Sequence, residues 1–415
     1  MPAKQPGFYV LIAAQFASAL ADNALLLLVI ALLQAQAQAA FWIPLIKVMF
    51  TLSYVLSGPW VGAWSDSRPK HGVMMRANGL KLAACIALIG GADPITAFAF
   101  TGLGAAMYAP AKYGLITELV PAEELVHANA WIEVSAVCAA LFGVMLGGAL
   151  VSDAWLSSAL CKYLKDALPF QQTFAVSMGL IGLLYVLAAA LNTRIPDSGK
   201  RYADTGWHIR EVWHNFIKDQ RTLWRDPLGG VSLSVTSLFW GVGASMQLLV
   251  LAWAQTMLDL NLTQAAYLQA VTAIGVMAGA ALAARCVSLA NAPLVLSAGI
   301  GLGLALPLMT QIHNWEWAMV LTLALGMLGG FFVVPMNAML QARGVQLLSA
   351  GRSISVQNTC ENSSVLLLLC AYSLLAYLQV PVQGLIWALA ALIVTGMCGM
   401  TWRYRQISRG AVING

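Results

Sequence analysis

Several charged and amide side chains stand inside long apolar segments of this sequence. Asp22, followed by Asn23 in the string LADNALLLLV, lies in the middle of the first long apolar segment, 8–33. A charge at the centre of a membrane helix costs roughly 2.5 to 3.5 kcal/mol, so such residues are candidates for function. The Asp22 carboxylate could bind a cationic group, carry a proton or pair with a structural cation, and we expect it to be functional.

Two lysines with polar neighbours extend this set. Asn78 and Lys81 lie one helical turn apart and therefore on one helix face, although Lys81 could also extend to the water interface. Lys112 follows Pro110, where a helix should kink and free backbone carbonyls. We expect Lys112 to meet a phosphate or to pair with Glu133.

Two later segments carry polar stripes. Glu133 lies four residues after Asn129. A second segment carries a polar stripe of Gln357, Asn358, Glu361 and Asn362. A stripe of this kind must face the interior of a helix bundle. Contact with a substrate and hydrogen bonding between helices are both open interpretations.

These groups form the predicted substrate-binding set. Its members are Asp22, Asn23, Asn78, Lys81, Lys112, Tyr113, Glu133, Gln247, Asn337, Asn358, Glu361 and Asn362. The seven cysteines are scattered and have no paired spacing that suggests a metal or disulfides. We expect no catalytic residue, no metal and no cofactor.

The elements that must position these residues are membrane helices. The chain has 415 residues, of which 60% are hydrophobic and 9% charged, against roughly 25% charged residues in a soluble domain. Its continuous apolar runs predict helices that cross a bilayer, not barrel strands. The expected spans are 8–33, 40–64, 73–92, 95–117, 126–151, 170–193, 228–257, 263–285, 289–311, 316–341, 353–379 and 382–402.

One long polar stretch, 195–226, divides the chain into two parts, 1–194 and 227–415. We expect two six-helix bundles joined by this cytoplasmic linker. Aromatic and basic residues alternate in the linker in a roughly helical pattern. This predicts an amphipathic helix on the inner leaflet, and a solvated linker with packed aromatics is the alternative.

The positive charges favour one orientation. Most of the 22 Lys and Arg residues fall in segments that share one side of the membrane in this arrangement, while the loops on the other side hold only Lys162 and Lys165. The positive-inside rule therefore predicts that both termini are cytoplasmic. It also explains the net charge of +5 without a nucleic-acid partner.

The two parts resemble each other weakly. Pro335 follows Pro110 by 225 residues (335 − 110), and Glu361 follows Glu133 by 228 residues (361 − 133). The same register brings Asp22 to Gln247. Internal repeats of this kind are typical of transporters.

A short motif carries a first resemblance. Gly62 and Asp66 belong to the segment GAWSD, which Arg68 follows after Ser67. The segment resembles the loop motif of the major facilitator superfamily, although Ser67 and Pro69 depart from its usual pattern. The resemblance implies the fold of that superfamily, with twelve transmembrane helices, and a gating role for Gly62, Asp66 and Arg68.

Longer strings carry a narrower resemblance. They are AQFASALADNALLLLVIALL, RANGLKL, YAPAKYGLITEL, SLFWGVG, GGFFVVPMNAMLQ and VQNTCENSSVLLL, and they extend over almost the whole chain. The sequence resembles the bacterial lysophospholipid transporters, a family of that superfamily.

This resemblance implies a function and a location. The expected function is inward transport of lysophosphatidylethanolamine and lysophosphatidylglycerol across the bacterial inner membrane. The resemblance further implies a functional link to a cytoplasmic acyltransferase and acyl carrier protein synthetase that restores the second acyl chain. We expect a monomer.

Two rival functions are weighed against it. An exporter of drugs or of another amphipathic small molecule would have the same fold, whereas a sugar or peptide carrier should have more polar residues in its cavity. The spacing of His214 and Asp219 matches that of glycerolipid acyltransferases. The linker has no room for a domain of that kind, so we expect no enzyme.

Overall fold

Long helices follow one another along the chain, as the apolar runs predict. The computed structural model describes residues 6–36, 42–167, 174–202 and 208–413. The long helices of the first half are α1 (Pro6–Ala35), α2 (Trp42–Asp66), α3 (Lys70–Ile89), α4 (Pro94–Leu119), α5 (Leu125–Val151) and α8 (Ala175–Asn192). Those of the second half are α10 (Pro227–Met257), α11 (Leu262–Cys286), α12 (Leu296–Ala305), α13 (Trp315–Leu347), α14 (Ala350–Tyr377) and α15 (Val382–Ile413).

Shorter helices complete the description. The 3₁₀ helices η2 (Leu289–Val295) and η3 (Leu306–Gln311) flank α12 and extend it to the length of a span. The connecting helices are η1 (Ala122–Glu124), α6 (Asp153–Leu156), α7 (Ala159–Ala167) and α9 (Ile209–Arg225).

Eleven helical segments within the described residues are long and apolar enough to cross a membrane. Each matches one of the expected spans. The remaining expected span, 95–117, forms α4, which is 26 residues long but does not belong to that set. Most of α4 is buried between its neighbours, and its small and polar residues therefore face protein more than lipid.

Small residues bring helices of one half close together. In the first half a β-carbon on Gly102 of α4 would lie 2.8 Å from the backbone of Phe50 in α2. In the second half a β-carbon on Gly330 of α13 would collide with the backbone of Val276 in α11. Such contacts provide van der Waals packing where lipid removes the hydrophobic driving force between helices.

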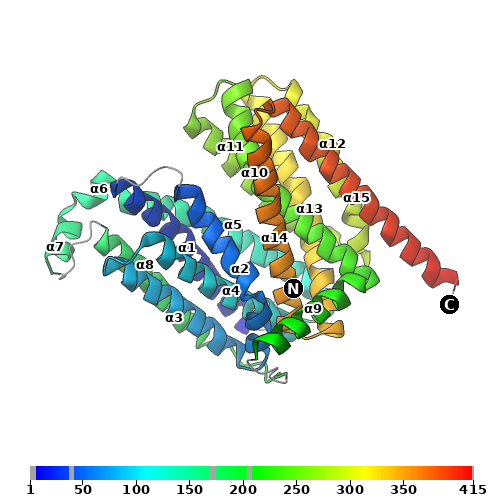
Figure 1. The fold of residues 1–415 in the computed structure, drawn as a ribbon, viewed down its shortest axis with the longest axis horizontal. Coiled ribbons are helices and arrows are strands. Elements are labelled where there is room, and N and C mark those ends of the chain that lie inside the picture. Colours follow the sequence, from blue (N-terminus) through cyan, green and yellow to red (C-terminus); the bar gives the residue numbers. More distant parts are fainter. Residues whose placement is uncertain (1–5, 37–41, 168–173, 203–207, 414–415) are drawn as a thin grey trace.

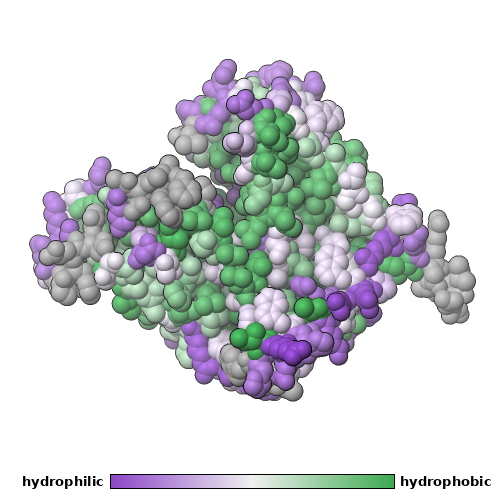
Figure 2. All heavy atoms as spheres, in the orientation of Figure 1, coloured by the Kyte–Doolittle hydropathy of each residue, from purple (hydrophilic) through white to green (hydrophobic). Residues whose placement is uncertain are grey.

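The two halves form two bundles side by side (Figure 1). Helices α2 and α14 pack across the seam between the bundles, as do α5 and α11. The bundles meet at the end where α9 lies, and they splay apart at the opposite end, where Figure 2 shows a notch between them. We call the α9 end the closed end and the other the open end.

The outer surface fits a hydrocarbon environment. Large apolar side chains project from both halves, for example Leu183 (62% exposed) and Leu367 (69% exposed). Figure 2 shows apolar residues over the middle of the molecule and hydrophilic residues toward its two ends. This distribution places the long helices across a bilayer.

The glycine contacts give a stability prediction. Gly330→Leu should destabilise the second half by about 1–3 kcal/mol, because the new side chain has no space against α11. Gly399→Leu is the control, since a β-carbon there has no neighbour within 4 Å. Thermal unfolding of both proteins in detergent measures the difference, and equal melting temperatures would contradict the packing described.

Candidate functional site

An ion pair lies inside the first half, between α1 and α3. The Lys81 Nζ lies 2.6 Å from the Asp22 Oδ2, and the two side chains are 2% and 16% exposed. From α8, the Tyr185 hydroxyl donates to the Asp22 Oδ1 over 2.8 Å. Lys81 therefore does not extend to the water interface. Of the three roles considered for Asp22, the structure shows the ion pair with a structural cation, Lys81.

A second layer of polar groups satisfies the Lys81 ammonium. Its Nζ donates to the Ser18 hydroxyl over 3.1 Å, and that hydroxyl donates to the Asn78 Oδ1 over 2.7 Å. The rings of Tyr108 and Tyr185 have their centres 5.5 and 5.8 Å from Nζ. A buried pair needs such additional partners, because removal of either charge would leave the other uncompensated.

A second group of charges lies where α4 and α5 face the second half. The Lys112 ammonium lies 4.0 Å from the centre of the Tyr113 ring, and it interacts electrostatically with Glu133 and Glu361. Among the described residues, neither Lys112 nor Glu133 has a hydrogen bond or an ion pair within 4.0 Å. The expected direct pair between these two described residues is thus absent, and their charges interact only electrostatically.

The second half contributes amides and a carboxylate to the same region. The Gln357 amide donates to the Glu361 Oε1 over 2.8 Å and to the Asn337 Oδ1 over 3.0 Å, which joins α13 to α14. The Asn362 amide donates to the backbone oxygen of Asn358 over 2.8 Å. The buried Gln357 Oε1 and Asn358 Nδ2 have no partner within the described residues, so one acceptor and one donor remain free.

The weak repeat in the sequence corresponds to spatial proximity. Pro110 lies within α4 and Pro335 within α13. Glu133 lies on α5 and Glu361 on α14, and the two carboxylates interact electrostatically. The repeat register therefore brings one acid from each half to the region of Lys112.

Two predicted residues lie apart from these charges. The Asn23 amide donates to the backbone oxygen of Ala19 over 2.8 Å, within its own helix. Gln247 is exposed on α10, and its backbone oxygen accepts from the Gln269 amide over 2.6 Å. In the described residues neither side chain has a hydrogen bond to the charged groups above.

Asp66, at the end of α2, caps the first turn of α14 in the other half. Its carboxylate accepts from the backbone N–H of Gly351 over 2.8 Å, from that of Arg352 over 3.0 Å and from the Ser349 hydroxyl. Lys70 adds a cation 3.8 Å away. A carboxylate is stabilised at a helix N-terminus by the free N–H groups and the helix dipole. This contact therefore holds the two halves together at the closed end.

The predicted gating residues contribute differently. A β-carbon on Gly62 would lie 2.7 Å from that of Ser355, so only glycine allows this approach of α2 to α14. Beside it, the Ser355 hydroxyl donates to the backbone oxygen of Gly58. The Arg68 guanidinium lies 5.4 Å from the centre of the Trp64 ring, within its own half.

A further contact at the seam was not predicted. The amides of Asn129 in α5 and Gln341 in α13 exchange two hydrogen bonds, of 2.8 and 2.9 Å. Asn129 was recognised as part of a polar stripe, and the string GGFFVVPMNAMLQ ends at Gln341. The two residues are 212 positions apart in the sequence, so no local pattern indicates that their amides pair.

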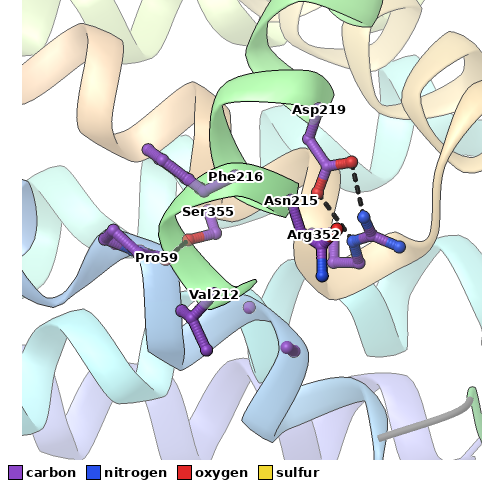
Figure 3. Close-up of a pocket in the computed structure, with 10 residues that line it drawn as sticks. Pro59, Val212, Asn215, Phe216, Asp219, Arg352 and Ser355 are labelled. Atoms are coloured by element: carbon purple, nitrogen blue, oxygen red, sulfur yellow. Dashed lines mark hydrogen bonds and ion pairs between the residues drawn. The ribbon is translucent and has the colours of Figure 1, made fainter. Parts of the chain in front are cut away.

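Helix α9 covers the seam at the closed end (Figure 3). Its Asp219 accepts from the Arg352 Nε over 2.6 Å and from Nη2 over 2.5 Å. Burial raises the pKa of Asp219, and the hydrogen bonds from Arg352 offset part of that rise. Val212 and Phe216 line a small cavity together with Pro59 of α2. The helix thus contacts both halves.

The spacing of His214 and Asp219 does not create a catalytic pair. Residues five apart on a helix point to different faces. His214 is exposed, whereas Asp219 is buried against Arg352. The carboxylate is therefore not available to orient the imidazole.

Two helix bundles, a seam closed at one end and charged groups between them define a membrane transporter. The model of the Major Facilitator Superfamily matches residues 10–369. The lysophospholipid transporter LplT of Cronobacter sakazakii is 36% identical over 96% of this chain and 96% of its own. That of Citrobacter koseri is 37% identical over 97% and 96%. The chain belongs to the Major Facilitator Superfamily and, within it, to the family of these lysophospholipid transporters.

Solved structures support the fold. A bacterial homologue of the iron transporter ferroportin in an outward-facing state has a TM-score of 0.72 at 17% identity, covering 98% of this chain and 100% of that one. The human organic anion transporter MFSD10 also has a TM-score of 0.72, at 15% identity, covering 95% and 100%. At this identity the comparison concerns the fold alone.

The contact between Asp66 and α14 gives a testable prediction. Asp66→Asn removes the charge that caps α14, so a cysteine in place of Gln341, in a chain without its natural cysteines, should react several times faster with a maleimide. Asp197→Asn is the control, because Asp197 pairs with Arg201 at an exposed site of the linker. Equal labelling rates in both variants would show that Asp66 does not hold the seam closed.

Proposed function

We propose that this protein moves lysophosphatidylethanolamine and lysophosphatidylglycerol inward across the bacterial inner membrane. The observation that carries the proposal is the pair of opposite charges on Lys112 and Glu133 beside the seam, which interact electrostatically but have no direct hydrogen bond or ion pair within the described residues. A lysophospholipid head group has an anionic phosphate, and lysophosphatidylethanolamine adds an ammonium group. In a site with little water such charges need charged partners.

The head group is assigned to named side chains. Lys112 binds the phosphate, while Glu133 and Glu361 receive the ammonium of the ethanolamine. The glycerol hydroxyls of lysophosphatidylglycerol use the free acceptor of Gln357 and the free donor of Asn358. Gln247, where a cation would suit the phosphate, is neutral, and this leaves the phosphate to Lys112.

The pair of Asp22 and Lys81 is given a supporting role in this proposal. Its carboxylate keeps some exposed surface, while Lys81 is almost fully buried. A ligand that reached Asp22 would compete with Lys81 for the same oxygen. Neutralisation of Asp22 would leave the buried Lys81 ammonium uncompensated, so we expect it to abolish uptake, although the protein still inserts into the membrane.

Charge and shape support the inward direction. The cation-rich segments gather at the closed end, which the positive-inside rule places in the cytoplasm. The molecule would then be open outward, ready to receive lipid from the outer leaflet, with the acyl chain against its apolar helices. Reacylation by a cytoplasmic acyltransferase would trap the lipid, so the cycle needs no coupled ion.

Export of a drug or of another amphipathic small molecule is the alternative. The same fold and apolar walls would suit it, and the few polar groups disfavour a sugar or peptide. A binding panel of lysophospholipids, drugs and polar solutes on the purified protein separates these functions. Preference for a drug over both lysophospholipids would support the alternative.

The charge on Lys112 gives the sharpest prediction. Lys112→Gln should lower uptake of labelled lysophosphatidylethanolamine about 10- to 100-fold, because a hydrogen bond to a charged group contributes about 1.5–3 kcal/mol. Lys162→Gln removes an exposed cation from α7 and should leave uptake unchanged. Uptake is measured in proteoliposomes with matched protein content.

The same assay can contradict the proposal. If Lys112→Gln transports as well as the Lys162→Gln control, the phosphate does not bind where we propose. Uptake with and without a proton gradient tests the driving force in the same vesicles, and the proposal expects equal rates.

A further inference from the structure

Helix α9 has three lengthwise zones, each with its own chemistry. One zone is buried against the bundles, and its members are Val212, Phe216, Asp219 and Leu223. They recur every three or four residues and therefore form one face. This face closes over the seam, with Asp219 bound to Arg352 of α14 and Phe216 beside Gly58 of α2.

The second zone is apolar but exposed. It consists of Ile209 (68% exposed), Trp213 (40%), Ile217 (42%) and Trp224 (38%). Trp213 also touches the ring of Trp60 in α2, with ring centres 5.8 Å apart, so the zone continues onto the first half. An exposed stripe with two tryptophans is typical of the boundary between head groups and acyl chains.

The third zone is basic and lies next to the apolar one. Its members are Arg210, Lys218, Arg221 and Arg225, all exposed, with His214 among them. Helical geometry places them on the flank of the apolar zone, away from the buried face. No ion pair within 4.0 Å joins any of these four cations to another described residue. Their charges remain open to an external anion.

We propose that α9 binds the anionic phospholipid head groups of the leaflet on its own side of the membrane. Its tryptophans would enter the boundary of the acyl chains, and its four cations would contact the lipid phosphates. Helix α15 helps to hold α9 in place, because the Arg403 guanidinium donates to the backbone oxygen of Trp224 over 3.0 Å.

Charge complementarity decides between possible occupants. An acidic protein would also suit the four cations, but it would not account for the exposed apolar stripe beside them. A bilayer surface offers acyl chains to the apolar zone and anionic head groups to the basic zone beside it. Lipid on these two zones leaves the contacts of the buried face intact, so α9 can bind the membrane and cover the seam together.

The test uses the full-length protein in nanodiscs of phosphatidylcholine with increasing phosphatidylglycerol. An environment-sensitive dye on a cysteine in place of His214, in a chain without its natural cysteines, reports contact with the membrane. The variant Arg210→Gln, Arg221→Gln, Arg225→Gln should lower the apparent affinity for phosphatidylglycerol about 100-fold, since each cation adds roughly fivefold.

A matched control removes three exposed cations that lie outside α9, two in the first half and one in the linker, in Arg76→Gln, Arg194→Gln, Lys200→Gln. This control should keep the response. Salt at about 1 M should abolish the response of the unmodified helix, which tests the proposal without any substitution in it.

Three results would overturn the proposal. The first is a dye response that does not change with the phosphatidylglycerol content, and the second is an equal loss of apparent affinity in the two triple variants. The third is a dye response to an acidic polypeptide in pure phosphatidylcholine that phosphatidylglycerol does not reproduce. The last result would assign the basic zone to a protein partner.

Discussion

The structure depends on one constraint, which is that hydrocarbon does not solvate polar groups. Each charge or amide inside the bundles must find a partner in the protein or remain there at a cost. Asp22 and Lys81 satisfy this constraint with each other and with Ser18 and Tyr185. Lys112 and Glu133 interact only electrostatically, without a hydrogen bond or ion pair within 4.0 Å in the described residues. We propose that this difference separates an internal support from a site for a charged ligand.

The seam follows the same logic at its closed end. The Asp66 carboxylate is held by backbone N–H groups of the opposite half, and the amides of Asn129 and Gln341 satisfy each other. Close helix packing occurs at the seam as well as inside each half, since β-carbons on Gly62 and on Gly330 would both be too near the neighbouring helix. We propose that the two bundles move as units and that water replaces the polar contacts of the seam when the closed end opens.

Much of the fold could be predicted, because span length and continuous apolar runs are local properties. Helix α4 is the expected span that is not among the helices apolar enough to cross a membrane, because its burial against other helices removes the need for high hydropathy. Partners could not be predicted. Lys81 pairs with Asp22 across 59 residues and Gln341 with Asn129 across 212, and only the packing of helices decides such contacts. The motif at Asp66 indicated a gate, but not that its carboxylate would cap α14.

The central claim is that the closed end opens and the open end closes around a lysophospholipid. Pulsed electron paramagnetic resonance on two spin-labelled pairs tests it most directly. One pair replaces Arg76 and Arg285 at the closed end, and the other replaces Lys162 and Glu316 at the open end. With lysophosphatidylethanolamine, the account predicts longer distances for the first pair and shorter distances for the second. Distances that change in the same direction, or that stay fixed while the lipid is bound, would contradict it.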